Sequence, residues 1–155
     1  MSYLRATRVL CWLLAIAVLV SVVHYLDNYL NYDDYPQPDA DSSLPAPSAA
    51  VVGIAWFAFT AVGGVGLLLW FRRHITSAAI VLTGYSISGL IGIGHYVVPG
   101  ATDMVWWRQT HVILDIVCGA AILGFALWAA RNSSELVGPG RIIRNDPRRE
   151  PPPAS

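Results

Sequence analysis

The chain has 155 residues, of which 55% are hydrophobic and only 13% are charged, and its formal net charge is zero. A soluble domain of this size is about a quarter charged, so this composition argues against an ordinary water-soluble protein. The zero net charge gives no reason to expect a nucleic-acid partner. We therefore expect one domain whose main partner is the lipid bilayer.

Four apolar segments, taken in chain order, are each long enough to cross a bilayer as a helix. They cover residues 9–26, 50–71, 75–98 and 105–130. A helix satisfies its own backbone hydrogen bonds in lipid, so the sequence predicts an all-α, four-transmembrane-helix bundle over residues 1–130. The first segment has no small-residue cleavage site after it, so we expect it to be retained rather than removed as a signal peptide.

Two segments outside the spans differ in charge. The loop over residues 27–49 carries five aspartates and no basic residue, and its prolines favour an extended chain. The segment over residues 131–155 is rich in Arg, Pro and Gly and ends REPPPAS. We expect this second segment to be a disordered cytoplasmic tail.

The arginines predict the orientation of the spans. All ten basic residues are arginine, and nine of them fall on one side if the helices alternate in direction. These nine are Arg5, Arg8, Arg72, Arg73, Arg131, Arg141, Arg144, Arg148 and Arg149. Basic residues gather on the cytoplasmic side, so we expect both termini inside a bacterial plasma membrane. The exception, Arg108, would lie on the outer side.

Ionisable residues within the spans are costly unless they are paired, and they often mark function. With the orientation above, five of them fall at one depth, in the outer third of the membrane. They are His24, Asp27, His95, His111 and Asp115. His95 lies on the same helical face as the small residues Gly84, Ser88 and Gly92, which favours a position inside the bundle.

Three chemistries suit this set of residues. Imidazole and carboxylate are ligands of divalent transition metals, with the remaining carboxylate orienting a ligand. A histidine and an aspartate can also move protons, including in acid–base chemistry on a lipid-soluble substrate. A single haem b between His95 and either His24 or His111 is the third alternative.

Two alternatives need no ligand. His111 and Asp115 are spaced to form an ion pair on one helix, and Arg108 is close enough in sequence to balance the carboxylate. The chain would then be an accessory or assembly subunit that packs against other membrane-protein subunits. Its short loops and small-residue stripes fit that role.

The stretch HYLDNYLNYDDYP, over residues 24–36, carries a family resemblance. It resembles an element of small bacterial four-helix membrane proteins, in which H-x-x-D near the end of the first helix precedes an aromatic residue and a proline. The resemblance implies no particular activity. It does imply that His24 and Asp27 are the residues to test first.

Overall fold

The computed structural model describes residues 1–38, 42 and 47–138, and every regular element in these ranges is a helix. This confirms the predicted all-α class. The long helices are α1 (Tyr3–Leu30), α2 (Ala49–Phe71), α3 (Ile75–Leu90) and α4 (Trp106–Arg131). The short ones are the 3-10 turns η1 (Tyr32–Asp34), η2 (Ile91–Tyr96) and η3 (Ala101–Asp103), and the final helix α5 (Ser133–Val137).

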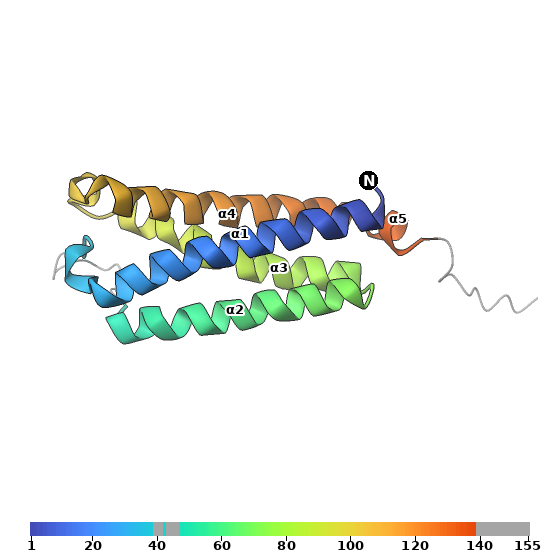
Figure 1. The fold of residues 1–155 in the computed structure, drawn as a ribbon, viewed down its shortest axis with the longest axis horizontal. Coiled ribbons are helices and arrows are strands. Elements are labelled where there is room, and N and C mark those ends of the chain that lie inside the picture. Colours follow the sequence, from blue (N-terminus) through green and yellow to red (C-terminus); the bar gives the residue numbers. More distant parts are fainter. Residues whose placement is uncertain (39–41, 43–46, 139–155) are drawn as a thin grey trace, which may run out of the picture.

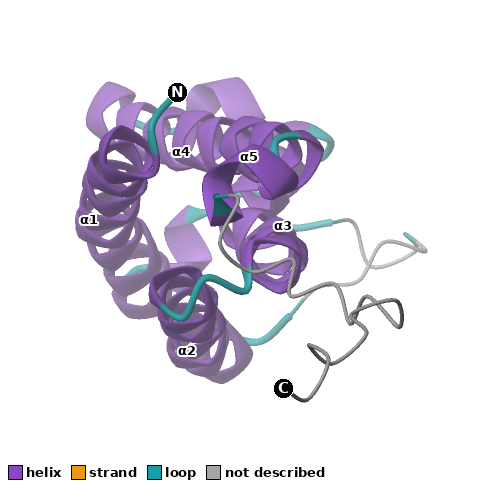
Figure 2. Cartoon of the chain, turned by 90° about the vertical axis from the view of Figure 1, so that its right-hand side faces the viewer, coloured by secondary structure: helices purple, strands orange, loops and turns teal. Residues whose placement is uncertain are grey.

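The four long helices alternate in direction along one axis (Figure 1). Seen from one end, α1 lies beside α2 and α4, and α3 packs against the same two helices (Figure 2). The N-terminus, the α2–α3 turn and α5 share one end of the bundle (Figure 1). The α1–α2 and α3–α4 connections therefore meet at the opposite end.

Each of α1, α2 and α4, and α3 together with η2, is long and apolar enough to cross a membrane. Their outward side chains fit that environment, because Trp12, Leu19, Ile54, Phe57 and Ile80 are each about two-thirds exposed or more. A water-soluble protein rarely exposes so much apolar surface. The structure thus supports a multi-pass membrane protein.

The helix boundaries differ from the predicted spans at their polar ends. Helix α1 extends to Tyr3–Leu30 although the apolar run covers only residues 9–26, because polar residues in its end turns keep helical geometry. The third span is not one continuous α-helix. After α3 ends, η2 continues the span as a tighter 3-10 helix that contains Gly92 and Gly94. This change brings His95 onto a 3-10 turn rather than an α-helix.

The start of the C-terminal segment is ordered. Leu136 of α5 is 3% exposed and packs in the core with Trp70 and Ile75. The Arg73 guanidinium donates to the Leu136 carbonyl at 3.1 Å and lies over the Tyr3 ring. The expected disorder after residue 131 therefore does not begin before α5 ends, and residues 139–155 lie outside the described ranges.

Two glycines allow α3 and α4 to approach backbone to backbone. A Cβ atom on Gly89 would collide with the Asp115 carbonyl oxygen. A Cβ atom on Gly119 would lie 2.7 Å from the Ser86 carbonyl oxygen and 2.9 Å from the Leu90 nitrogen. Small residues permit such close crossings in membrane bundles. This crossing sets the position of Asp115 relative to the rest of the bundle.

Candidate site: a buried histidine cluster

Three histidines from three elements meet at the end of the bundle opposite the N-terminus. The His24 ring, on α1, lies 5.5 Å from the His111 ring on α4 and 5.7 Å from the His95 ring on η2, measured between centroids. His24 and His111 are 2% and 7% exposed. We call these three residues the histidine cluster. Their expected proximity was a sequence-based prediction, and the structure brings the three side chains together.

His24 is tied to a carboxylate on another helix. Its Nδ1 lies 2.7 Å from Oδ2 of Asp115, and both residues are 2% exposed. His111, which is on the same helix as Asp115, was the partner expected from spacing. The long-range pair forms instead because the Gly89–Gly119 crossing fixes where Asp115 lies, and α1 supplies the facing imidazole.

Asp27 has a different set of partners. Its Oδ2 accepts hydrogen bonds from Arg108 Nε at 2.8 Å and from the Tyr35 hydroxyl at 2.6 Å. Its Oδ1 accepts from Asn31 Nδ2 at 2.7 Å. His111 Nε2 also approaches Asp27 Oδ2, at 3.4 Å, but without hydrogen-bond geometry. Since both oxygens are already occupied, Asp27 is mainly a structural ion-pair partner.

Arg108 joins α4 to α1 and to η1. It is 6% exposed, and its guanidinium reaches Asp34 Oδ2 at 3.2 Å as well as Asp27. It also lies over the rings of Tyr35 and Trp107, at 4.9 and 5.1 Å from their centroids. The sequence suggested that Arg108 balances Asp115, but its ion pairs in the structure are with Asp27 and Asp34. The charge of Asp115 is therefore left to His24.

His95 differs from the other two histidines in its surroundings. Its Nε2 lies 3.2 Å from the Asn28 amide nitrogen, and its ring centroid is 5.0 Å from that of Tyr35. It is only partly buried. His95 is therefore the member of the cluster closest to the surface of the bundle.

Several imidazole nitrogens in the cluster have no hydrogen-bond partner among the residues that the structure describes. They are Nε2 of His24 and both ring nitrogens of His111, and all three atoms are buried. Unpaired polar atoms are rare in protein interiors and often indicate an ion, a water or a ligand. Among the residues that the structure describes, however, no group of three or more His, Cys, Asp or Glu side chains is placed to hold a metal ion.

Tyr35 is a central residue that the sequence did not single out as part of the site. It directly follows η1, is 2% exposed and packs with Met104 and Val112. Burial and the hydrogen bond to Asp27 both hold the pKa of its hydroxyl well above its usual range. The tyrosine spacing could not reveal this, because the chain turns at η1 and folds Tyr35 back over the cluster.

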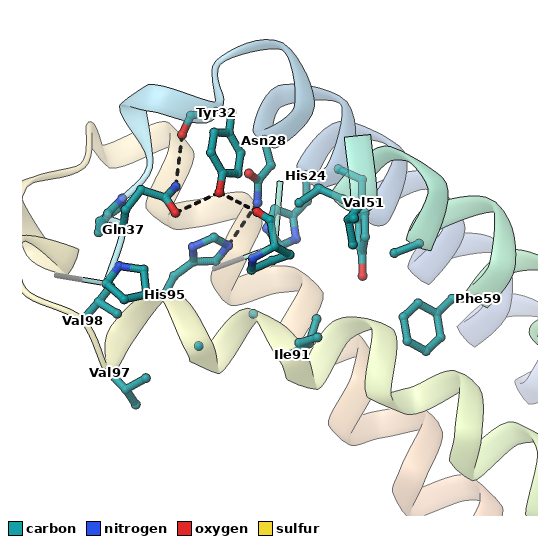
Figure 3. Close-up of a pocket in the computed structure, with 18 residues that line it drawn as sticks. His24, Asn28, Tyr32, Gln37, Val51, Phe59, Ile91, His95, Val97 and Val98 are labelled. Carbon is teal, nitrogen blue, oxygen red and sulfur yellow. Dashed lines mark hydrogen bonds between the residues drawn. The ribbon is translucent and has the colours of Figure 1, made fainter. Parts of the chain in front are cut away.

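A cavity of about 400 Å³ adjoins the histidine cluster, between α1, α2 and η2. Figure 3 shows His24, Asn28 and His95 on one side of it, and Val51, Phe59 and Ile91 on the others. Its surface is mostly apolar, with the polar atoms supplied by a few residues. Concave, largely apolar sites with a few convergent polar groups are typical of small-molecule binding.

Comparisons with protein-family models, with curated proteins and with solved structures found no match to this chain.

Proposed function

We propose that this chain is a multi-pass protein of a bacterial plasma membrane, with both termini cytoplasmic, whose histidine cluster handles protons near the extracytoplasmic face. The observation that carries this proposal is the buried His24–Asp115 pair, in which His24 keeps an unpartnered second nitrogen. The orientation rests on the arginine distribution. With that orientation, the end of the bundle that holds the cluster faces outward.

Charge balance indicates why the pair should carry a proton. Arg108 neutralises Asp27, so the buried centre holds one further carboxylate, Asp115, with no fixed cation beside it. Leaving a buried carboxylate unbalanced costs far more than protonating it or its partner. The pair therefore retains one proton, either on Asp115 or as an imidazolium on His24. Such a proton has two alternative positions and is ready for transfer.

The other histidines give this proton a path. His24 lines the cavity and also contacts Asp115 on α4, so it links this carboxylate to the cavity. His95 lies beside it at the partly exposed edge, and His111 lies on the Asp27 side. Imidazole carries protons efficiently because one nitrogen can accept while the other donates.

The test is the protonation state of His24 in the purified full-length protein, measured from the nitrogen chemical shifts of labelled histidine. We expect an imidazolium signal near neutral pH that disappears in Asp115→Asn, because the amide needs no counter-charge. His74→Ala is the matched control, since His74 is an exposed histidine in the α2–α3 turn. Neutral His24 in the wild type, with no protonated carboxyl band for Asp115 in the infrared spectrum, would overturn the proposal.

A transition-metal site is the second candidate, suggested by three imidazoles from different elements in one cluster, whose rings would have to move before they could share an ion. Three imidazoles on one tetrahedral ion, with metal–nitrogen bonds of about 2.0–2.1 Å, have centroids about 5 Å apart. The 5.5 and 5.7 Å separations from His24 are slightly larger. His24, His95 and His111 would hold the ion after small ring movements, and Asp115 would orient His24 through Nδ1.

The metal candidate is tested by adding Zn²⁺ to metal-free protein and measuring bound zinc. Stoichiometric binding that is lost in His24→Ala and His111→Ala, but kept in His74→Ala, would support it. Binding that is weak or unaffected by these substitutions would exclude it. A haem between His24 and His95 fits less well, because it would have to displace Tyr35, whose ring lies 5.0 Å from His95 and 6.5 Å from His24.

A further inference from the structure

The polar side chains in the described part of the cavity wall gather near His24. His24, Asn28 and His95 line this polar end, and Tyr32 and Gln37 close the adjacent side (Figure 3). The Tyr32 hydroxyl is already bonded to Gln37 and to the Pro47 carbonyl. The groups left to meet a ligand are therefore mainly those of Asn28 and the histidines.

The described residues that line the cavity include no Arg, Lys, Asp or Glu. Arg108 is the nearest candidate for binding an anionic head group, but it is engaged by Asp27 and Asp34 and does not line the cavity. A carboxylate or phosphate in an apolar site needs a partner of opposite charge. The described part of the lining therefore suits a neutral head group.

The polar end favours a hydrogen-bond acceptor. As the side chains are placed, the Asn28 amide nitrogen donates to His95 Nε2 at 3.2 Å. A neutral His95 then carries its hydrogen on Nδ1, which lies on the side of the ring away from Asn28 (Figure 3). The second hydrogen of the Asn28 amide is then available to a carbonyl oxygen in the cavity.

The rest of the wall suits a ring and an apolar chain. Tyr25 and Phe59 supply aromatic surface, and Val52 and Ala55 supply aliphatic surface along α2. Three further lining residues are more than half exposed, at 52%, 57% and 61% for Val51, Ile91 and Val97. These residues connect the cavity with the apolar outer surface of the bundle, which we treat as its lipid-facing side.

We infer that this cavity binds a neutral, lipid-soluble molecule of the quinone type, with its carbonyl-bearing ring at Asn28 and His95 and its apolar chain along α2. This inference deepens the proposed function, on which it rests, by naming the ligand class of the same site. A volume of about 400 Å³ falls within the range of small-molecule sites, and it accommodates a ring with a short chain. The ligand ring would lie next to His24, and thus next to the proton held with Asp115.

The test uses the full-length protein in detergent and a benzoquinone with a decyl chain as the probe. Bound quinone is measured by equilibrium dialysis against micelles without protein. We expect saturable binding near one equivalent, and at least tenfold weaker binding in Ala55→Phe, which fills the cavity. Ala58→Phe is the matched control, since Ala58 is on the same helix but is exposed and outside the cavity; it should bind as the wild type does.

Two further measurements control for misfolding of the variant and for binding through the alkyl chain alone. If Ala55→Phe fails to fold by circular dichroism, Ala55→Leu replaces it, with weaker binding again expected. Decanoic acid, which has the chain but a charged head, should fail to compete with the quinone. No binding above empty micelles, equal binding by the cavity-filling variant, or full competition by decanoic acid would each overturn the inference.

The proton proposal and the ligand inference can fail independently of each other. The proton proposal is judged from the spectra of His24 and Asp115, and the ligand inference from quinone binding by the wild type and Ala55→Phe, so the two results are independent. If His24 proves neutral and Asp115 shows no protonated carboxyl band, while quinone binding is saturable and sensitive to Ala55→Phe, the proton proposal fails and the ligand inference stands. If the imidazolium is present and no quinone binds, the reverse holds.

Discussion

Replacing Arg108 by glutamine tests whether the Arg108–Asp27 pair holds together the end of the bundle opposite the N-terminus. The guanidinium is 7% exposed and donates to Asp27 Oδ2 at 2.8 Å, while the Asp27 side chain is 10% exposed. Removing one partner of such a buried pair usually costs about 3–5 kcal/mol, because the other charge is left without compensation. Asp27 would keep its hydrogen bonds from Tyr35 and Asn31. We therefore expect the free energy of unfolding to fall by an amount near the lower limit, about 3 kcal/mol.

The reverse substitution and the double variant give the magnitude of the coupling. In Asp27→Asn, Arg108 keeps its ion pair with Asp34, whose side chain is 63% exposed. Solvent compensates part of the lost interaction, so we expect the free energy of unfolding to fall by about 2 kcal/mol. In the Asp27→Asn, Arg108→Gln double variant no charge is stranded, and the amide oxygen introduced at position 27 can still accept from Tyr35. We expect the double variant to lose only about 2 kcal/mol, less than the sum of the singles.

The assay is reversible unfolding in mixed micelles, with the free energy of unfolding measured for all four proteins. The wild type and the three variants form one double-mutant cycle, whose coupling energy should be about 3 kcal/mol by the figures above. If Arg108→Gln loses less than about 1 kcal/mol, the pair behaves as an exposed ion pair and the burial argument is wrong. Losses that simply add in the double variant would refute the pairing itself.

Three more predictions concern the helix crossing, the outer loop and the topology. Gly119→Ala should destabilise the protein by roughly 2–3 kcal/mol, because the added Cβ would press on the Ser86 carbonyl. The control Gly124→Ala, whose Cβ meets no atom within 4 Å, should be neutral or up to about 1 kcal/mol more stable. Similar stabilities of the two variants in thermal unfolding would contradict the close crossing. Because the folded-state pKa of Tyr35 is raised, its contribution to stability is present below the usual tyrosine pKa of about 10 and is lost as pH rises through the folded-state value. Tyr35→Phe should therefore flatten the alkaline fall in stability measured by unfolding from pH 9 upward, and an unchanged slope would refute this. A reporter active only in the cytoplasm, fused after Ser155, should be active, and activity of a periplasmic reporter there would reverse the orientation.

The sequence alone determined the helices and their environment. Runs of apolar residues about 20 long can satisfy their backbone only as helices in lipid, so local composition predicts the spans without knowledge of their packing. The same local argument selected His24, His95 and His111, because polar residues within such runs avoid lipid and turn toward one another. Their shared depth followed from counting residues along alternating helices.

Only the tertiary structure decided which ionisable side chains pair with each other. Asp115 pairs with His24, 91 positions away, rather than with His111 on its own helix. Arg108 pairs with Asp27 rather than Asp115. These choices depend on how each helix is rotated about its axis and on how closely α3 and α4 cross at Gly89 and Gly119, and spacing along one helix carries no information on either.

The cavity also came only from the tertiary structure. Its wall combines residues of α1, α2 and the 3-10 turn η2 with others from η1 and the loop after it. Burial of Tyr35 likewise required the chain to fold back after η1. Local patterns fix what each segment is made of, whereas the space between segments depends on side chains that are distant in sequence and must fit together at once.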